Sequence, residues 1–395
     1  MAEWKEYKLG EIAEFRTGKL NSNAAVDNGK YPFFTCAPET YYINNYAFDQ
    51  KAILLAGNNA EGNFNIKYYE GRFNAYQRTY IINPISYDVD IHFLFYALQL
   101  CLNQFKTLSQ GTSTKFLTAK ILNAFSIQVP SLSIQKRIVD IIKSLDDKIE
   151  LNRKINANLE AQAQALFKSW FVDFEPFKDQ PFVESELGMI PEGWRIVSLD
   201  DMTSKFGTGL NPRKNFKLGE GNNYYVTIKN MGNNRVYLDD KCDKINDEAI
   251  EKINKRSKLQ AGDLLFSGIG TIGRVALITE TPQNWNTSES VFNMHPSEGI
   301  SSEFLYLLLL SDEFQNYVKI NAQGGVQQGI RMASLKQYQM ALPNDRALRA
   351  FDNIATPIVS LIKENDKEID RLASLRDALL PRLMSGELKV GEVEK

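Results

Sequence analysis

The chain has 395 residues, and its composition is that of a folded protein. Hydrophobic residues make up 43% and aromatic residues 11% of the sequence, which suits packed cores and excludes a disordered chain. The formal net charge is −2, so binding to nucleic acid would require a locally basic surface. The three cysteines are scattered, which argues against a disulfide framework or a zinc site. The length predicts two or three domains.

The sequence shows no sign of export or membrane insertion. The first ten residues lack the apolar core of a signal peptide. No apolar run reaches the length of a membrane span, and the nearest candidate, Phe304–Leu310, is too short. We therefore expect a soluble, cytoplasmic protein with no membrane partner.

The sequence pattern of residues 1–130 predicts a globular domain of mixed α/β type. Apolar runs such as Ala52–Ala56 are bounded by Gly, Asn and Pro, which is typical of short strands joined by loops. A helix is predicted from Ile91 to about Lys106, and a polar loop at Gln110–Lys115 follows it. A last strand is expected at Phe125–Val129.

A long helix is predicted over residues 131–175. Its apolar residues recur at alternating steps of four and three, the heptad period of a helix that packs along another helix. About forty helical residues extend over roughly 60 Å, so this helix needs a partner of similar length. Ser133 is the expected N-cap, because its hydroxyl can accept from first-turn amides. The heptad positions are Ile138, Ile142, Leu145, Ile149, Leu159, Ala163, Leu166 and Trp170.

A second heptad helix is predicted within residues 344–395, and we expect the two helices to form an antiparallel coiled coil. An irregular linker at 176–190 and a second globular domain at 191–343 lie between them. Pro357 lacks an amide hydrogen, so it should bend the second helix or delay its start. The repeating positions here are Leu348, Phe351, Ala355, Ile358, Ile362, Asn365, Ile369, Leu372, Arg376, Leu379 and Leu383.

The two halves of the chain resemble each other, which indicates a tandem repeat of domain plus helix with pseudo-two-fold symmetry. The segment that starts at Trp4 aligns with the one that starts at Trp194. The run from Leu54 aligns with the run from Leu265. The matched glycines are Gly57 with Gly268 and Gly62 with Gly273. The pairs related by an offset of 213 are Gln110 and Gln323, Gly111 and Gly324, Pro130 and Pro343, Asn152 and Asn365, Leu159 and Leu372, and Leu166 and Leu379.

Three asparagines, Asn152, Asn156 and Asn365, interrupt the apolar seam of the helices. A polar residue in a coiled-coil core lowers stability but selects one register. The alternative is that these side chains face solvent where the helices diverge. Two-fold symmetry would place the helix midpoints opposite each other, so we expect Asn152 and Asn365 to lie together and share a hydrogen bond.

Three junction segments resemble the specificity subunit of type I restriction–modification systems: LFKSWFVDFEPF from Leu166, ELGMIPEGWRIVSL from Glu186, and LRDALLPRLMSGEL from Leu375. The order of domain, helix, domain and helix is similar too. The resemblance covers essentially the whole chain, and within the globular domains it is one of architecture only.

The resemblance implies that each globular domain reads one half of a split sequence in double-stranded DNA. It implies that the helices set the spacing and dock two modification (methyltransferase) subunits, which restriction/translocase subunits can join. S-adenosylmethionine, ATP and Mg would bind those partners, so we expect no cofactor or metal on this chain.

The motifs of an enzyme are missing or out of context. Gly268–Gly273 reads GxGxxG, but the strand-like RVALIT follows it, so we expect a tight turn between two strands. The tripeptides at Asn83 and Asn211 do not fit the tetrapeptide with which methyltransferases hold a flipped base. The two histidines occupy non-equivalent positions, which gives little support to histidine catalysis. We therefore expect a non-catalytic component.

Polar and basic loops are the candidates for contact with phosphates and base edges. For any single loop residue, the alternative is an ordinary exposed position. For the chain, the alternative is a coiled-coil scaffold whose duplicated domains bind protein; salt-dependent, selective binding to a bipartite duplex would separate the two. The candidate DNA-binding residues are Asn58, Asn59, Ser113, Thr114, Lys115, Arg213, Lys214, Lys217, Gln327, Gln328 and Arg331.

Overall fold

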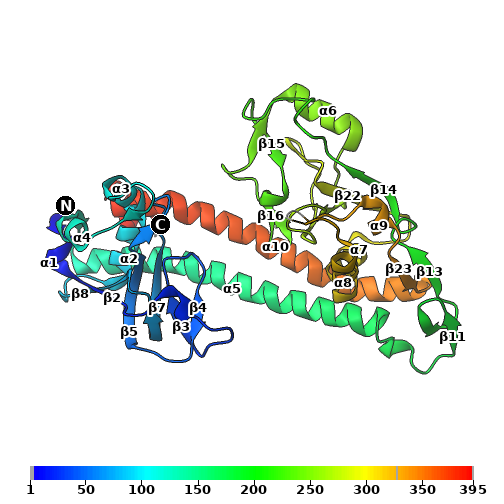
Figure 1. Ribbon diagram of the computed structural model, residues 1–395, viewed down its shortest axis with the longest axis horizontal. Coiled ribbons are helices and arrows are strands. Elements are labelled where there is room, and N and C mark those ends of the chain that lie inside the picture. The colour runs from blue at the N-terminus through cyan, green and yellow to red at the C-terminus, as the bar shows by residue number, and fades with distance from the viewer. Residues whose placement is uncertain (1–3, 326–327, 394–395) are drawn as a thin grey trace. The chain divides into compact units, whose positions relative to one another are not determined.

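The computed structural model describes residues 4–325 and 328–393, and the chain divides into two compact units (Figure 1). The first unit holds residues 1–151 and 368–395, and the second holds residues 152–367. Each unit contains one globular domain and part of each of two long helices, α5 (Leu132–Phe171) and α10 (Asp345–Met384). Each helix has 40 residues, so the division between the units crosses both helices.

Domain 1 is built on a six-stranded sheet with the strand order β2-β8-β5-β7-β3-β4. Strand β3 runs parallel to β7, and the other neighbours are antiparallel. Residues 52–56 of the central strand β5 are all buried, as the predicted strand requires. The strands are β1 (Lys5–Lys8), β2 (Ala13–Thr17), β3 (Tyr31–Phe34), β4 (Tyr41–Ile43), β5 (Phe48–Ala56), β6 (Asn58–Asn59), β7 (Ile66–Ala75), β8 (Thr79–Pro84), β9 (Lys115–Phe116) and β10 (Ser126–Val129). The helices are α1 (Leu9–Ile12), α2 (Ile91–Leu100), α3 (Leu102–Leu108) and α4 (Ala119–Ala124), and α11 (Val390–Val393) lies near the C-terminus.

Domain 2 repeats four of these strands in the order β14-β22-β19-β20. A separate sheet, β18-β15-β21, repeats the pairings of β4-β3-β7, one antiparallel and one parallel. Helix α6 packs against β21 of this sheet and against β14 of the first one. The strands of the second unit are β11 (Phe182–Ser185), β12 (Gly188–Pro191), β13 (Arg195–Ser198), β14 (Thr203–Thr208), β15 (Asn223–Val226), β16 (Met231–Gly232), β17 (Arg235–Val236), β18 (Asp243–Ile245), β19 (Leu264–Ser267), β20 (Val275–Leu277), β21 (Trp285–Thr287), β22 (Val291–Pro296) and β23 (Gln339–Leu342). The short helices are α6 (Asp247–Ser257), α7 (Ser302–Leu310), α8 (Asp312–Asn321) and α9 (Met332–Lys336).

The ends of the two domains show the predicted repeat. In domain 1, β1 pairs with β10 and sets Lys5 opposite Val129. In domain 2, β13 pairs with β23 and sets Arg195 opposite Leu342. In both cases an antiparallel pair closes the domain just before a long helix begins. The tandem duplication and the mixed α/β fold are therefore confirmed.

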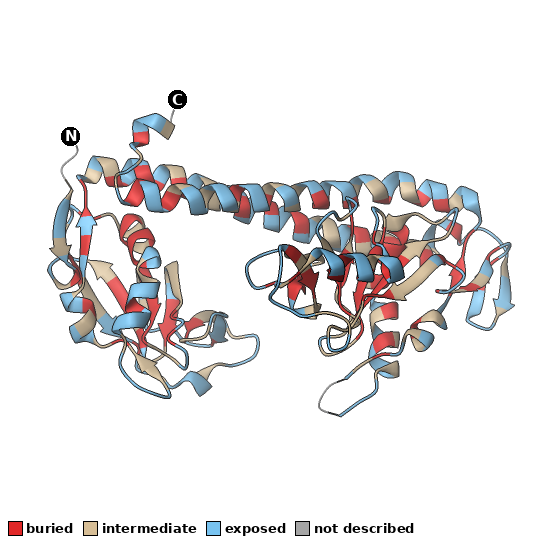
Figure 2. Cartoon of the chain, turned by 90° about the horizontal axis from the view of Figure 1, so that it is seen from above, coloured by how far each residue is buried: buried red, intermediate tan, exposed pale blue. Residues whose placement is uncertain are grey.

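The long helices are antiparallel where they pair in the first unit. Asp146 of α5 lies 2.8 Å from the guanidinium of Arg376 on α10. Two residues further along α5, Lys148 lies 3.4 Å from Glu368. Residue numbers rise on one helix as they fall on the other. Figure 2 shows buried residues recurring along both helices, as the heptad pattern predicts.

Two of the three seam asparagines of the second unit are buried rather than solvated, and Asn365 is half-buried. Asn152 is 0% and Asn156 7% exposed. The amide of Asn365 donates to Asn156 Oδ1 at 2.8 Å. Asn365 therefore bonds to Asn156 and not, as was expected, to Asn152. The reason is that the helices pair about one turn away from the register that their midpoints suggest. Phe171 packs on Phe351 at 4.7 Å between ring centroids, so the helices are antiparallel in this unit too.

Two predicted helix features are wrong. Helix α5 begins at Leu132, so Ser133 lies inside the first turn, and the carbonyl of Ser131 accepts the first amide bonds instead. Of the two effects expected of Pro357, the delayed start is wrong, because α10 runs from Asp345 to Met384; the bend stays a prediction. The missing amide hydrogen costs the helix one backbone bond, and packing along its buried face offsets that loss.

Two connections also differ from the sequence predictions. The linker after α5 is not irregular, since Phe182–Ser185 and Gly188–Pro191 form an antiparallel hairpin. The helix predicted at 91–106 divides at Cys101 into α2 and α3. None of the helices in the described residues is both long and apolar enough to cross a membrane.

Candidate nucleic-acid interface

Three loops of domain 1 are hydrogen-bonded into one cluster. The first loop (residues 18–24) follows β2, the second (57–65) follows β5, and the third (110–117) leads into α4. Gly57 in the second loop donates to the carbonyl of Arg78 at 2.8 Å and accepts from Leu117 of the third loop at 2.9 Å. Gln77, beside Arg78, donates to the carbonyl of Leu20 in the first loop at 2.9 Å. We call this assembly the loop cluster of domain 1.

The loop cluster contains all five DNA-binding candidates of domain 1. Asn58 and Asn59 form β6, which pairs with β9 and sets Asn59 opposite Lys115. Ser113 and Thr114 lie in the turn just before β9. Residues that are more than fifty positions apart in the sequence are thus neighbours on one surface.

Two cationic residues at this cluster were not predicted from the sequence. The Arg78 guanidinium lies 5.2 Å from the centroid of the Phe116 ring, and Lys106 donates to Asn63 Oδ1 at 2.7 Å. The sequence pattern placed Lys106 at a helix end and gave Arg78 no role; in the structure Arg78 lies just before β8, which starts at Thr79. The signal that could have revealed them is a basic residue at the boundary of an apolar run.

Domain 2 carries an equivalent cluster of three loops (residues 209–218, 268–274 and 323–330). Gly268 donates to the carbonyl of Ser290 at 2.9 Å and accepts from Ile330 at 2.9 Å, repeating the bonds of its domain 1 counterpart. Gln323 and Gly329 exchange two backbone hydrogen bonds of 2.8 Å. The same exchange closes the third loop of domain 1, so backbone geometry is shared even where side chains differ.

The GxGxxG segment is the second loop of this cluster. It joins β19 and β20, which are antiparallel, so the predicted turn between strands is confirmed. Gly273 has φ 92°, which favours glycine. Gly270 donates to the carbonyl of Gln328 at 2.8 Å, which holds the turn against the third loop.

The candidates of domain 2 lie in two of its three loops, except for Arg331, which follows the third loop. Asn211, in the first loop, donates to Glu289 at 2.6 Å. Ser290, which follows Glu289 in the chain, accepts from Gly268 of the second loop. The first loop therefore belongs to the cluster. Gln327 lies outside the described residues. The exposed candidates are Arg213, Lys214 and Lys217 in the first loop, Gln328 in the third loop and Arg331 just beyond it.

The first loop of domain 2 starts at a glycine that no other residue can replace without a shift of the backbone. A Cβ on Gly209 would lie 1.6 Å from the carbonyl oxygen of Thr287, and a Cβ on Gly18 of domain 1 would lie 1.8 Å from that of Ala75. Both contacts are with main-chain atoms, which cannot rotate away. The close approach sets the direction in which each first loop leaves the sheet.

We expect Gly209→Ala to destabilise domain 2 by about 1–3 kcal/mol, the usual cost of overpacking, and to weaken DNA binding through the displaced loop. Urea unfolding of the purified chain measures the first effect. Gly325→Ala is the matched control, because a Cβ there meets nothing within 4 Å. Equal stability of the two variants would contradict the argument.

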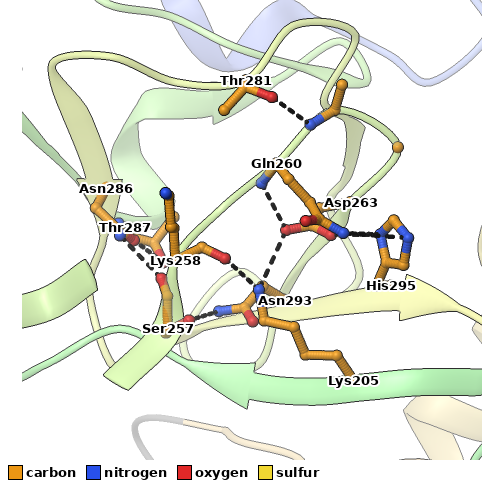
Figure 3. A network of polar contacts seen from close by, with 12 residues as sticks. Lys205, Ser257, Lys258, Gln260, Asp263, Thr281, Asn286, Thr287, Asn293 and His295 are labelled. Atoms are coloured by element: carbon orange, nitrogen blue, oxygen red, sulfur yellow. Dashed lines mark hydrogen bonds and ion pairs between the residues drawn. The ribbon is translucent and has the colours of Figure 1, made fainter. Parts of the chain in front are cut away.

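A buried polar network supports domain 2 at the far end of its strands (Figure 3). The Asp263 carboxylate, 0% exposed, lies 2.8 Å from His295 Nδ1 and accepts from the backbone amide of Gln260 at 3.0 Å. Strand register places this end away from the loops, because Leu264 lies opposite Met294 and the following residues lead toward the second loop. The network stabilises the sheet, and His295 belongs to it rather than to the loop cluster.

The loop clusters offer hydrogen-bond donors and positive charge. Lysine and arginine contact phosphates, and asparagine and glutamine amides can pair with base edges in the major groove. Within residues 4–325 and 328–393, no group of three or more His, Cys, Asp or Glu side chains could hold a metal ion. This donor set suits recognition of a polyanion.

Residues 1–161 and 191–371 match the family described as type I restriction modification DNA specificity domain. The chain belongs to this family. The two matched regions together cover well over half of the chain, and each contains one domain with the first part of a long helix. The family expected from the sequence is thereby confirmed.

Known members of the specificity-domain family resemble the chain over nearly its full length. The type I restriction enzyme EcoDI specificity subunit of Escherichia coli is 27% identical, over 98% of this chain and 89% of that protein. The HindI specificity subunit of Haemophilus influenzae is 26% identical, over 98% of this chain and all of that protein. A crystal structure of a type I restriction–modification S subunit from Mycoplasma genitalium has the same fold, with a TM-score of 0.62 at 15% identity, and covers 97% of this chain and 96% of that one. These relatives are named specificity subunits, in line with the non-catalytic role expected from the sequence.

Proposed function

We propose that this chain is the DNA sequence-specificity subunit of a type I restriction–modification system and that each domain reads one half of a bipartite site. The observation that carries the proposal is the duplicated loop cluster. Two sets of loops share their backbone hydrogen bonds and present polar and basic side chains. A protein with two equivalent reading surfaces suits a target with two parts.

The two half-sites should differ in sequence. Gly57 of domain 1 corresponds to Gly268 of domain 2. The two residues that follow are Asn58 and Asn59 in domain 1 but Ile269 and Gly270 in domain 2. Lys115 corresponds to Gln328 through the common offset of 213. Because amide, aliphatic and cationic side chains make different contacts with base edges, a shared backbone with different side chains predicts a non-palindromic site.

The partners and cofactors form a further part of the proposal. We infer that two modification subunits dock on the long helices and that restriction subunits join them. Ile354 and Leu361, two turns apart on α10, are 46% and 43% exposed, and such an apolar face suits a protein partner. S-adenosylmethionine, ATP and Mg would then bind the partners, and the assembly would act in the cytoplasm, where its DNA is.

The test is to express the chain with its cognate modification subunit and map methylated bases in the host DNA. We expect a motif of two short specified parts separated by a spacer of fixed length and unspecified sequence. A single contiguous motif would contradict the assignment of one half-site to each domain. Absence of any motif, together with capture of a protein by the loop clusters, would favour the scaffold alternative.

We expect Lys115→Ala to weaken binding to all duplexes alike. If Lys115 neutralises one phosphate, the slope of log affinity against log salt should fall by about 0.9. Titration of the assembled methyltransferase with labelled duplex at several salt concentrations measures that slope. Lys178→Ala is the control, because Lys178 is exposed after α5 and pairs with Glu175 at 2.6 Å. A slope that changes equally in both variants would exclude a phosphate contact at Lys115.

A further inference from the structure

One of the contacts between domain 2 and the long helices of its own unit is made by a short hairpin. Strands β16 and β17 are joined by Asn233 and Asn234, whose φ angles are 46° and 55°. Two successive left-handed residues form the tight turn that matches the twist of a hairpin, and asparagine tolerates this conformation well. The tip of the hairpin therefore has a defined shape.

The tip of this hairpin bonds to both helices. The Asn234 carbonyl accepts from Lys363 Nζ of α10 at 2.9 Å. The Asn234 side-chain amide donates to Glu160 of α5 at 3.1 Å. The next residue, Arg235, donates to the main-chain carbonyl of Asp366 at 3.2 Å. One turn of domain 2 is thus tied to two helices at three points.

Lys363 is buried at this contact, with a side chain only 9% exposed. Its ammonium lies 3.3 Å from the Tyr306 hydroxyl and 3.9 Å from Asp366. Burial lowers the pKa of Lys363, and the nearby carboxylates of Asp366 and Glu160 oppose that shift. A buried ammonium adds little net stability, but its directional bonds restrict the geometry around it. The residue therefore fixes orientation more than it strengthens the fold.

The hairpin contact is continuous with the hydrogen-bonded pair Asn156 and Asn365 of the coiled coil. Asn156 donates to Asp366 Oδ1 at 3.0 Å and to the carbonyl of Ile362 at 3.2 Å. The same Asn156 accepts from Asn365. The bonds that hold the two helices in register thus share Asp366 with the bonds that hold the hairpin.

We propose that the hairpin Met231–Val236 is a positioning element that couples the register of the helices to the placement of domain 2 on the DNA. Lys363 and Asn234 are its positioning residues. This inference rests on the proposed function, because it assigns to the hairpin the accuracy with which the spacer between half-sites is measured. Base recognition stays with the loop clusters.

The test uses the complex of this chain with its modification subunit and duplexes that carry both half-sites. The spacer has its native length in one duplex and is one base pair shorter or longer in the others. Two variants break the contact: Lys363→Met keeps the aliphatic stem, and Asn234→Gly keeps the left-handed turn. The matched controls are Lys168→Met, whose residue lies on α5 and pairs with Asp173 just beyond the same helix, and Asn233→Gly, whose amide bonds to Tyr237 just after the hairpin.

We expect the ratio of methylation on native to altered spacers to fall about tenfold or more in both variants, the size expected when a hydrogen bond to a charged group is lost. Discrimination against a mismatch within either half-site should not change, nor should the controls lose spacer selectivity. Simple destabilisation would lower methylation on all duplexes and leave the ratio unchanged. Wild-type selectivity in both variants would overturn the inference. Failure of the wild-type complex to methylate a bipartite site would instead overturn the proposed function.

Discussion

Replacement of residues 194–343 by the matching segment of another specificity subunit is expected to change one half of the methylated sequence and leave the other half intact. The ends of this segment are neighbours, because β13 and β23 pair with Arg195 opposite Leu342. A segment with adjacent ends can be exchanged without moving the helix that follows it. All three loops of the domain 2 cluster lie inside the segment.

The expected effect is large because half of the reading surface changes identity. Specific binding exceeds non-specific binding by about 10³–10⁷-fold, so loss of the original half-site should remove detectable methylation at the old motif. Methylation mapping of cells with the chimaera and its partners measures both halves at once. An exchange of residues 5–129 of domain 1, whose ends are paired in the same way, is the reciprocal control. A chimaera that folds but loses both half-sites would show that the domains do not read separately.

The architecture was predictable because it follows from repeating patterns. The heptads gave both long helices, since a stripe of buried residues must recur every three or four positions whatever the rest of the chain does. The common offset gave the repeat, and Gln110 and Gln323 proved to make the same backbone exchange. Patterns of this kind depend on backbone geometry, which duplication preserved.

The composition of the site was only partly predictable, because it depends on contacts between distant segments. Arg78 joins the cluster only since the turn between β7 and β8 folds against Gly57. The predicted hydrogen bond of Asn365 missed its partner by one turn, because helix ends estimated from sequence do not define register to a single turn. The hairpin at Asn233 and Asn234 carries no recognisable motif, and only the structure shows that it contacts the helices.

Phe351→Ala should be the most destabilising single substitution in the second unit that we predict. Phe351 is 0% exposed, and its ring lies 4.7 Å from Phe171, 5.7 Å from Trp170 and 6.1 Å from Phe304, measured between centroids. The cluster therefore joins α10, α5 and α7. Removing a buried phenyl ring costs about 3–5 kcal/mol through lost burial and the cavity left behind.

The loss should be confined to the unit that contains the ring, since the core around Phe351 consists of residues from the second unit alone. Hydrogen exchange under native conditions, resolved by segment, should show faster exchange in α7 and in the first half of α10, while the β5–β7 sheet of domain 1 keeps its protection. Ile354→Ala is the matched control, because Ile354 lies on the same helix but is 46% exposed and should change stability by less than about 1 kcal/mol. Equal loss of protection in both domains would mean that the chain unfolds as one cooperative body. Loss of protection in the second unit alone would also predict that recognition of the domain 2 half-site is lost first on warming. The reason is that the loop cluster of domain 2 depends on a core that domain 1 does not share.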